Sequence, residues 1–207
     1  MIPVLWQGQP PSFQEAADRR VRQVLESFRL ERDVRGVFLK SRPGQYGDDA
    51  WIRWTHRRPI RVWLELEIGA FLGPARRAQV REAALPLAAI PSRCFSPRSF
   101  LDTLFHEFAH IHDELRHGIR AEAVPPSARQ AFNEVWNVWI DGRLQRSGKP
   151  GLKRRARLAF FRSTFPGALD SGRIFDELWN ADSLDHEALI RAVQGLKIPL
   201  ARSRSPR

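Results

Sequence analysis

Two histidines and a glutamate stand within five consecutive residues, His106-Glu107-Phe108-Ala109-His110. On an α-helix, residues four apart lie on the same face one turn apart, so both imidazoles can point toward one atom. Two such rings can bind one tetrahedral Zn²⁺ at about 2.0–2.1 Å each. Glu107 then lies beside the cation, where its carboxylate can accept a proton from water that the metal acidifies. This order of residues predicts metal-assisted hydrolysis.

The flanking residues predict that this stretch is helical. Ser96 can cap a helix whose first residue is Pro97, and Gly118 is suited to end that helix after His117. The apolar residues around the histidines provide a core-facing surface: Phe100, Leu101, Leu104, Phe105, Phe108 and Ile111. The alternative is a helix whose histidines are only polar surface residues.

In this setting the sequence resembles the zincin superfamily of metallopeptidases. Members have a sheet whose edge strand pairs with an extended peptide, then a helix with the His-Glu-x-x-His motif, then a second helix with the third ligand. By this resemblance, His106 and His110 are zinc ligands, Glu107 is the general base, and residues 61–68 form the substrate-pairing strand. The resemblance covers roughly residues 60–145. It implies hydrolysis of peptide bonds in a peptide or protein substrate.

The third ligand has two candidates, Glu134 and Asp141, on the next expected helix. Together with Asn137 they are spaced by three and four residues, so they share one face of an otherwise apolar stretch. Acids on a largely buried helix need partners, which a metal and its histidines would supply. The alternative is that both acids only form structural salt bridges with arginines.

The resemblance does not choose between the two acids. Glu134 fits the gluzincin arrangement, 24 residues after His110, although Val138 stands where gluzincins have a further acid. Asp141 fits a Trp-Asn-x-x-x-Asp pattern of poorly characterised zincin-like families, which begins here at Trp136. The acid that does not bind metal is expected to hydrogen-bond a ligand histidine. The metzincin pattern is excluded, because its glycine and third histidine are replaced by aspartate and arginine.

The residues before the histidine motif predict a helix and a small sheet. Residues 12–29 have apolar residues at helical spacing, and residues 36–40, 50–54 and 60–68 read as strands. The last strand alternates, with one apolar face made of Ile60, Val62, Leu64, Leu66 and Ile68. We expect a small antiparallel or mixed sheet.

The rest of the chain is expected to be mainly helical. Helices are predicted near residues 74–81, 127–146, 152–162 and 183–194. The whole pattern predicts an α+β, zincin-like fold with one domain over residues 1–200 and a disordered basic tail over residues 201–207.

Composition narrows the class of protein. The chain has 207 residues, of which 43% are hydrophobic, and this is enough for one substantial core. The single cysteine, Cys94, cannot form an internal disulfide. There is no apolar run long enough for a membrane span, and the first residues do not read as a secretory signal, so a cytoplasmic location is expected.

The chain is strongly basic, with 34 Lys and Arg against 23 Asp and Glu, a net charge of +11. Between Asp141 and Asp170 the charged residues are all basic: Arg143, Arg146, Lys149, Lys153, Arg154, Arg155, Arg157 and Arg162. We interpret this basic run as a solvated helix face in preference to a docking patch for nucleic acid, an acidic protein or a membrane surface.

Three hypotheses for function follow. The first is a zinc metallopeptidase. The second is a basic nucleic-acid-associated protein with a zincin-like metal site, acting as a protease on DNA-bound proteins. The third is a non-catalytic zincin-like regulator, against which the intact Glu107 argues.

Overall fold

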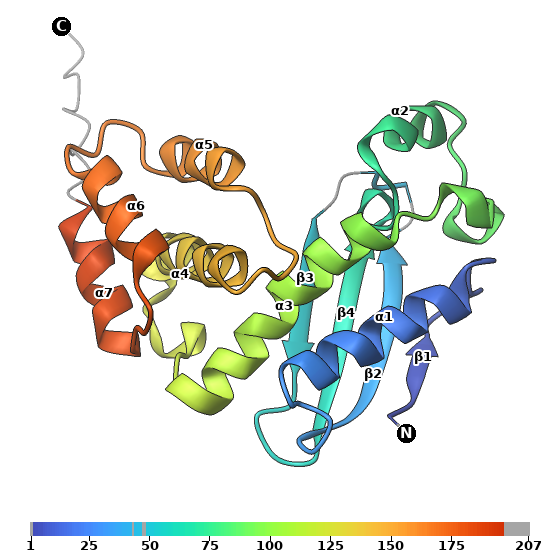
Figure 1. Cartoon of the computed structure of the whole chain (residues 1–207), viewed down its shortest axis with the longest axis horizontal. Coiled ribbons are helices and arrows are strands. Elements are labelled where there is room, and N and C mark those ends of the chain that lie inside the picture. Colours follow the sequence, from blue (N-terminus) through green and yellow to red (C-terminus); the bar gives the residue numbers. More distant parts are fainter. Residues whose placement is uncertain (1, 43, 47–48, 197–207) are drawn as a thin grey trace, which may run out of the picture. The chain divides into compact units, whose positions relative to one another are not determined.

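The computed structural model describes residues 2–42, 44–46 and 49–196. Backbone contacts divide the chain into two units, Met1–His112 and Asp113–Arg207, and each is described by itself (Figure 1). The first unit contains a sheet and helices, and the second is helical, so the expected mixed α and β content is confirmed. The single domain expected over residues 1–200 stays a prediction, and the expected tail, 201–207, lies outside the described residues.

A four-stranded sheet frames the first unit. Its spatial order is β1 (Val4–Trp6), β2 (Val34–Arg42), β4 (Ile60–Glu67) and β3 (Ala50–Trp54). The β1–β2 and β2–β4 pairs are parallel, whereas β3 is antiparallel to β4, so the sheet is mixed. The three strands expected from the sequence are confirmed, while β1 was not expected.

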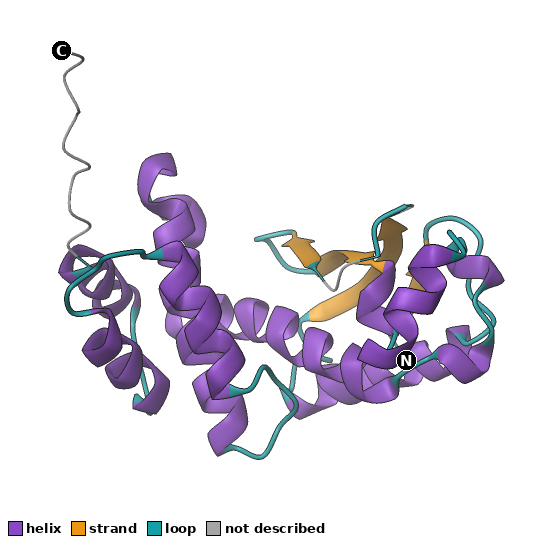
Figure 2. Ribbon diagram, turned by 90° about the horizontal axis from the view of Figure 1, so that it is seen from above, coloured by secondary structure: helices purple, strands orange, loops and turns teal. Residues whose placement is uncertain are grey.

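The two faces of the sheet differ in burial, as the alternate residues of β4 show. Ile60, Val62, Leu64 and Leu66 are buried, whereas the alternate residue Arg61 is exposed. The buried face packs against α1 (Gln14–Ser27) and the part of α3 (Pro97–His117) that belongs to this unit, which lie on one side of the sheet in Figures 1 and 2. The period of two along β4 therefore identifies the core side of the sheet.

Aromatic rings join these two helices to the rest of the unit. Phe28, just after α1, lies with its ring centroid 5.7 Å from that of Phe105 in α3. Phe100 of α3 stacks on Phe71 at 5.0 Å. The unit also contains α2 (Pro74–Glu82) and three short 3₁₀ turns, Ile68–Phe71, Leu87–Ala89 and Ser92–Cys94. The middle of α3 is thus held on a packed core.

The second unit is built around α4 (Pro126–Arg146). It contains the end of α3, a 3₁₀ turn (Ala121–Ala123), α5 (Arg154–Thr164), α6 (Ser171–Asn180) and α7 (His186–Gly195). The last three helices all pack against α4. The expected helices are confirmed, and α6 was not expected.

Gly142 allows α6 to approach α4 closely. A Cβ atom at this position would lie 2.3 Å from the carbonyl oxygen of Trp179, which is backbone and cannot move aside cheaply. Any larger residue would push the two helices apart.

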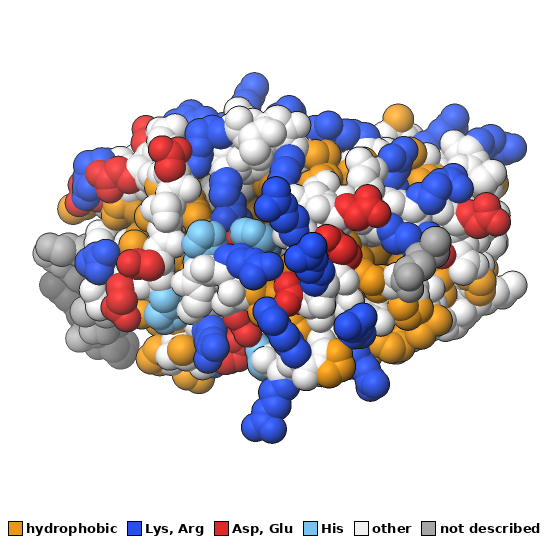
Figure 3. Space-filling view, turned by 60° about the horizontal axis from the view of Figure 1, so that its bottom comes forward, with side chains coloured by type: hydrophobic (Ala, Val, Ile, Leu, Met, Phe, Trp, Pro, Cys, Tyr) orange, Lys and Arg blue, Asp and Glu red, His pale blue; other side chains and the backbone are white. Residues whose placement is uncertain are grey.

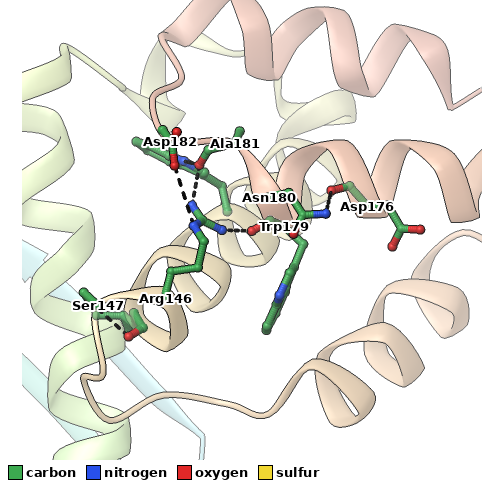
Figure 4. Close-up of polar contacts among 9 residues, drawn as sticks. Arg146, Ser147, Asp176, Trp179, Asn180, Ala181 and Asp182 are labelled. Carbon is green, nitrogen blue, oxygen red and sulfur yellow. Dashed lines mark hydrogen bonds and ion pairs between the residues drawn. The ribbon is translucent and has the colours of Figure 1, made fainter.

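Arg146 fixes the end of α6 (Figure 4). Its guanidinium donates hydrogen bonds to the carbonyl oxygens of Trp179 and Ala181, and its Nε lies 3.9 Å from the carboxylate of Asp182. The indole N–H of Trp139 donates to the same Ala181 carbonyl at 3.1 Å. Carbonyls at a helix C-terminus lack partners within the helix, so a cation there is stabilising.

In the part of the chain that is described, no helix is long and apolar enough to cross a membrane.

Candidate metal centre

The helix that carries the histidine motif begins and ends where its local signals predict. The hydroxyl oxygen of Ser96 accepts a hydrogen bond from the backbone N–H of Ser99 at 3.2 Å, and Pro97 is the first helical residue. At the other end, Gly118 has a φ of +65°, the left-handed conformation that ends helices most readily at glycine. Local sequence therefore sets the register of α3.

The packing of α3 leaves the motif residues at the edge of the core. Phe105, Phe108 and Ala109 are at most 3% exposed, whereas His106 and His110 are half-buried. The apolar residues anchor the helix on the first unit, and the two imidazoles occupy a different face of it. They are thus held on a rigid element without being sealed inside it.

The two rings are placed as a metal-binding pair requires. The centroids of His106 and His110 are 5.2 Å apart and their planes make an angle of 78°. In a tetrahedral site with Zn–N bonds of about 2.0–2.1 Å, two ligand imidazoles have centroids roughly 5 Å apart. The centroid separation is therefore compatible with two ligands of one zinc ion. Glu107, also half-buried, is the carboxylate next to it in the chain.

The candidate third ligands lie in the second unit, where a single arginine joins them. Arg157 donates from Nε to the Oδ2 atom of Asp141 at 2.6 Å, and its Nη1 lies 3.6 Å from Oε2 of Glu134. Asp141 is fully buried, and its Oδ1 also accepts the backbone N–H of Leu152 at 3.4 Å. Asn137, on the same face of α4, is half-buried.

These contacts confirm the salt bridges that were weighed as the alternative for Glu134 and Asp141. Whether either acid also binds metal stays a prediction. Arg157 was expected only as one cation of the basic run, although the sequence also carried a signal that it is buried. Arg157, Phe161 and Phe165 are spaced by four, and the two phenylalanines are at most 2% exposed, so this spacing places the arginine on the buried face of α5.

A second group of potential ligands stands at the end of α3. The ligand atoms of His112, Asp113 and His117 lie within 4.8 Å of one another. Asp113 is fully buried, however, and both of its oxygens accept strong donors. Nη2 of Arg143 is 2.6 Å from Oδ1, and the indole Nε1 of Trp136 is 3.0 Å from Oδ2. The carboxylate is thus already satisfied by protein groups.

The basic run is divided between structural and exposed residues. Arg143, Arg146, Arg154 and Arg157 each pair with an acid or with helix carbonyls of the second unit. Lys153, Arg155 and Arg162 are exposed. Lys and Arg side chains are also spread widely over the face drawn in Figure 3, as the net charge of +11 requires. Half of the basic run therefore makes contacts within the second unit, and the interpretation as a solvated helix face is wrong for the largely buried Arg143 and Arg157.

The expectation for the substrate-pairing strand is wrong. Residues 61–68 fall in β4 and the turn after it, and β4 is hydrogen-bonded on both sides, by β2 and by β3. Such a strand has no backbone edge to offer a peptide. Among the described strands, β1 and β3 form the two edges of the sheet.

Comparison with known proteins gives no relative for this chain: no protein family, curated protein or solved structure matches it.

Proposed function

We propose that the protein is a zinc-dependent metallopeptidase in which His106 and His110 bind the metal and Glu107 is the general base. The sequence offers Asp141 or Glu134 of α4 as the third ligand, and either acid would have to bind metal in competition with Arg157. The observation that carries the proposal is the pair of half-buried imidazoles, 5.2 Å apart between centroids, on a helix that also carries a carboxylate between them. The complete order of ligand, base and ligand favours an enzyme over a metal-binding regulator.

Each residue has a defined part in the reaction. When bound, Zn²⁺ supplies Lewis-acid polarisation of the substrate carbonyl and acidification of water. Glu107 accepts a proton as the water oxygen forms its bond to the carbonyl carbon. The same carboxyl group then gives that proton to the departing nitrogen as the C–N bond breaks, so the products are a carboxylate and an amine.

The sheet supplies a place for an extended substrate. A peptide can add to either edge strand, β1 or β3, through backbone hydrogen bonds, because both belong to the unit that carries the histidine pair. Backbone pairing of this kind fixes the direction of the substrate and tolerates many side chains. The proposed substrate class is therefore unfolded protein or extended peptide.

Metal analysis tests the site. Protein purified without chelators is expected to contain close to one zinc per chain by plasma mass spectrometry, and His106→Ala is expected to lose it. His112→Ala is the matched control, because His112 is also a half-buried histidine of α3 but packs against Phe28 at 5.3 Å. Wild-type protein without zinc, or equal zinc in the His106 variant, would refute the proposal.

Catalysis is tested separately from binding. Glu107→Gln is expected to keep its zinc and to cleave reduced casein or a fluorogenic peptide library about 10²–10⁴ times more slowly, the usual contribution of a general base. Glu122→Gln, which changes an exposed glutamate, is expected to retain full activity. Equal cleavage rates for the wild type and the Glu107 variant would refute Glu107 as the general base, even if the zinc site is real.

The third ligand can be assigned by the same measurement. Asp141→Asn and Glu134→Gln keep the size of each side chain and remove its charge. The variant that loses zinc while retaining its helical circular dichroism identifies the ligand, and retention of zinc in both variants would exclude both acids.

A further inference from the structure

The face of the sheet that points away from α1 and α3 carries aromatic and basic side chains. Within the described part of the first unit, no helix covers this face (Figure 2). Strand register places Leu5 beside Phe38, Phe38 beside Trp63, and Trp63 beside Arg53, a row that crosses all four strands. We call this surface the open sheet face: Leu5, Phe38, Lys40, Arg42, Trp51, Arg53, Arg61, Trp63, Glu65 and Glu67.

The apolar part of the open sheet face is unusually exposed. Leu5 is 48% exposed and Trp51 is 41% exposed. Phe38 and Trp63 are half-buried and stack on each other, with centroids 5.3 Å apart and planes only 12° from parallel. Large aromatic side chains gathered on an uncovered surface are a mark of a binding site, because leaving them in water is unfavourable.

The charged part of the face is mainly positive. Lys40, Arg42, Arg53 and Arg61 outnumber the two glutamates, and Arg61 is exposed. The guanidinium of Arg42 lies 4.0 Å from the ring centroid of Trp51, so this cation and an aromatic ring already share one patch. Glu65 lies between Lys40, at 3.8 Å, and Arg53, at 3.3 Å, and orders both cations. The chain as a whole carries a net charge of +11.

We propose that the open sheet face binds single-stranded nucleic acid. Bases stack on Trp51 and on the Phe38–Trp63 pair, and the cations of the face contact the phosphates. Aromatic rings interleaved with Lys and Arg are the combination that single strands require, since each base offers a π-face and each nucleotide one negative charge. In a duplex the bases are stacked on one another, so none of them is available to stack on the exposed aromatic rings of the sheet. The inference does not depend on the metal site.

Fluorescence anisotropy of the full chain tests this proposal. The probes are a labelled oligo(dT) of about 20 nucleotides, oligo(U) of the same length, and a duplex of matched length, at about 50 and 200 mM salt. The single strands are expected to bind more tightly than the duplex. Trp51→Ala is expected to weaken oligo(dT) binding roughly 5- to 100-fold, the loss of one stacked base, while Trp51→Phe retains most of the affinity. Arg61→Ala is expected to reduce the slope of log K against log salt by about 0.7.

Matched substitutions outside the face separate this site from general attraction to a basic protein. Phe160→Ala removes an aromatic ring of α5 that is 57% exposed, and Arg155→Ala removes an exposed cation of the basic run. Both variants are expected to bind like the wild type. Thermal melting of each variant confirms that the fold is kept. The proposal is overturned if the wild type does not bind, if it prefers the duplex, or if affinity falls in the α5 variants and not in Trp51→Ala.

Discussion

Two groups of potential metal ligands occur on α3, and they differ in what surrounds them. In the first, His106 and His110 are half-buried and their rings lie edge to face, with Glu107 between them in the chain. In the second, Asp113 is fully buried, its Oδ1 lies 2.6 Å from the guanidinium of Arg143, and its Oδ2 accepts a hydrogen bond from the indole N–H of Trp136. Ligand atoms are within 4.8 Å of one another in the second group, whereas the first has two neighbouring imidazoles in the residue order that hydrolysis needs.

The difference shows that proximity of histidine and carboxylate atoms is not enough to define a metal site. A cation at Asp113 would have to compete with the positive charge of Arg143, whose Nη2 already lies 2.6 Å from Oδ1 in a fully buried setting. The contacts of the second group, here called the Asp113 cluster, are therefore those of a structural ion pair. The ring geometry of the histidine pair, in contrast, matches the spacing of two ligands on one zinc ion.

Asp113→Ala is expected to have the largest effect. It leaves Arg143 and the indole N–H of Trp136 without their buried acceptor, so the free energy of unfolding should fall by about 3–5 kcal/mol. Urea unfolding followed by circular dichroism measures this loss. The zinc content of the folded variant should equal that of the wild type.

Two further variants serve as controls for that result, one for stability and one for zinc content. Glu15→Ala changes a carboxylate that is 94% exposed and should alter stability by no more than about 0.5 kcal/mol. His110→Ala should show the reverse pattern, with zinc lost. If Asp113→Ala loses zinc and keeps its stability, the two groups have been assigned the wrong way round.

Gly142→Ala tests how rigid the surroundings of the Asp113 cluster are. The new methyl group would meet the carbonyl oxygen of Trp179 at 2.3 Å, so α4 and α6 must separate, at a cost of about 1–3 kcal/mol. The drop in melting temperature measures this cost. Gly172→Ala in α6 is the matched control, because a Cβ atom at that position would meet nothing within 4 Å, and it should be neutral or stabilising. A stable Gly142 variant would mean that the helices near the cluster can shift and that its contacts are adjustable.

The sequence predicted those parts of the molecule whose signals are local. Ser96, Pro97 and Gly118 marked the ends of α3, and the alternation of apolar residues marked β4. The histidine pair followed from spacing on that helix. Each of these features depends on residues within a few positions of one another.

Features that depend on distant residues were missed. β1 has three residues, too few to show a period, and it forms only because β2 provides hydrogen-bonding partners. The central position of β4 depends on pairing with both β2 and β3, which alternation cannot reveal. The partner of Asp141 is Arg157, sixteen positions later on another helix. Such contacts are decided by tertiary packing and not by local pattern.

His117→Ala is expected to have a smaller effect on the Asp113 cluster. The His117 ring meets the fully buried ring of Trp139 edge-on, with centroids 5.6 Å apart and planes at 79°. Loss of one such aromatic contact costs about 0.5–1.5 kcal/mol. Zinc content should not change. Loss of zinc in this variant, measured beside His106→Ala, would place metal at the second group and contradict the comparison.

The smallest expected effect concerns Lys149, whose ammonium is repelled by Arg143, the ion-pair partner of Asp113. Burial, and to a lesser degree the positive charge of Arg143, lower the pKa of Lys149 below its ordinary value of 10.5. The unfolded chain therefore binds more protons between the folded pKa and 10.5, and stability should rise with pH through that window. Below the window, the charged lysine costs the folded state a small amount of free energy.

Lys149→Met should remove both this cost and its pH dependence. Because the side chain is only partly buried, the gain at neutral pH should be no more than about a few tenths of a kcal/mol. Lys153→Met, at an exposed position, should leave the pH profile of stability as it is in the wild type. An unchanged profile in the Lys149 variant would contradict the lowered pKa, because neither burial nor the charge of Arg143 would then disfavour the ammonium in the folded state.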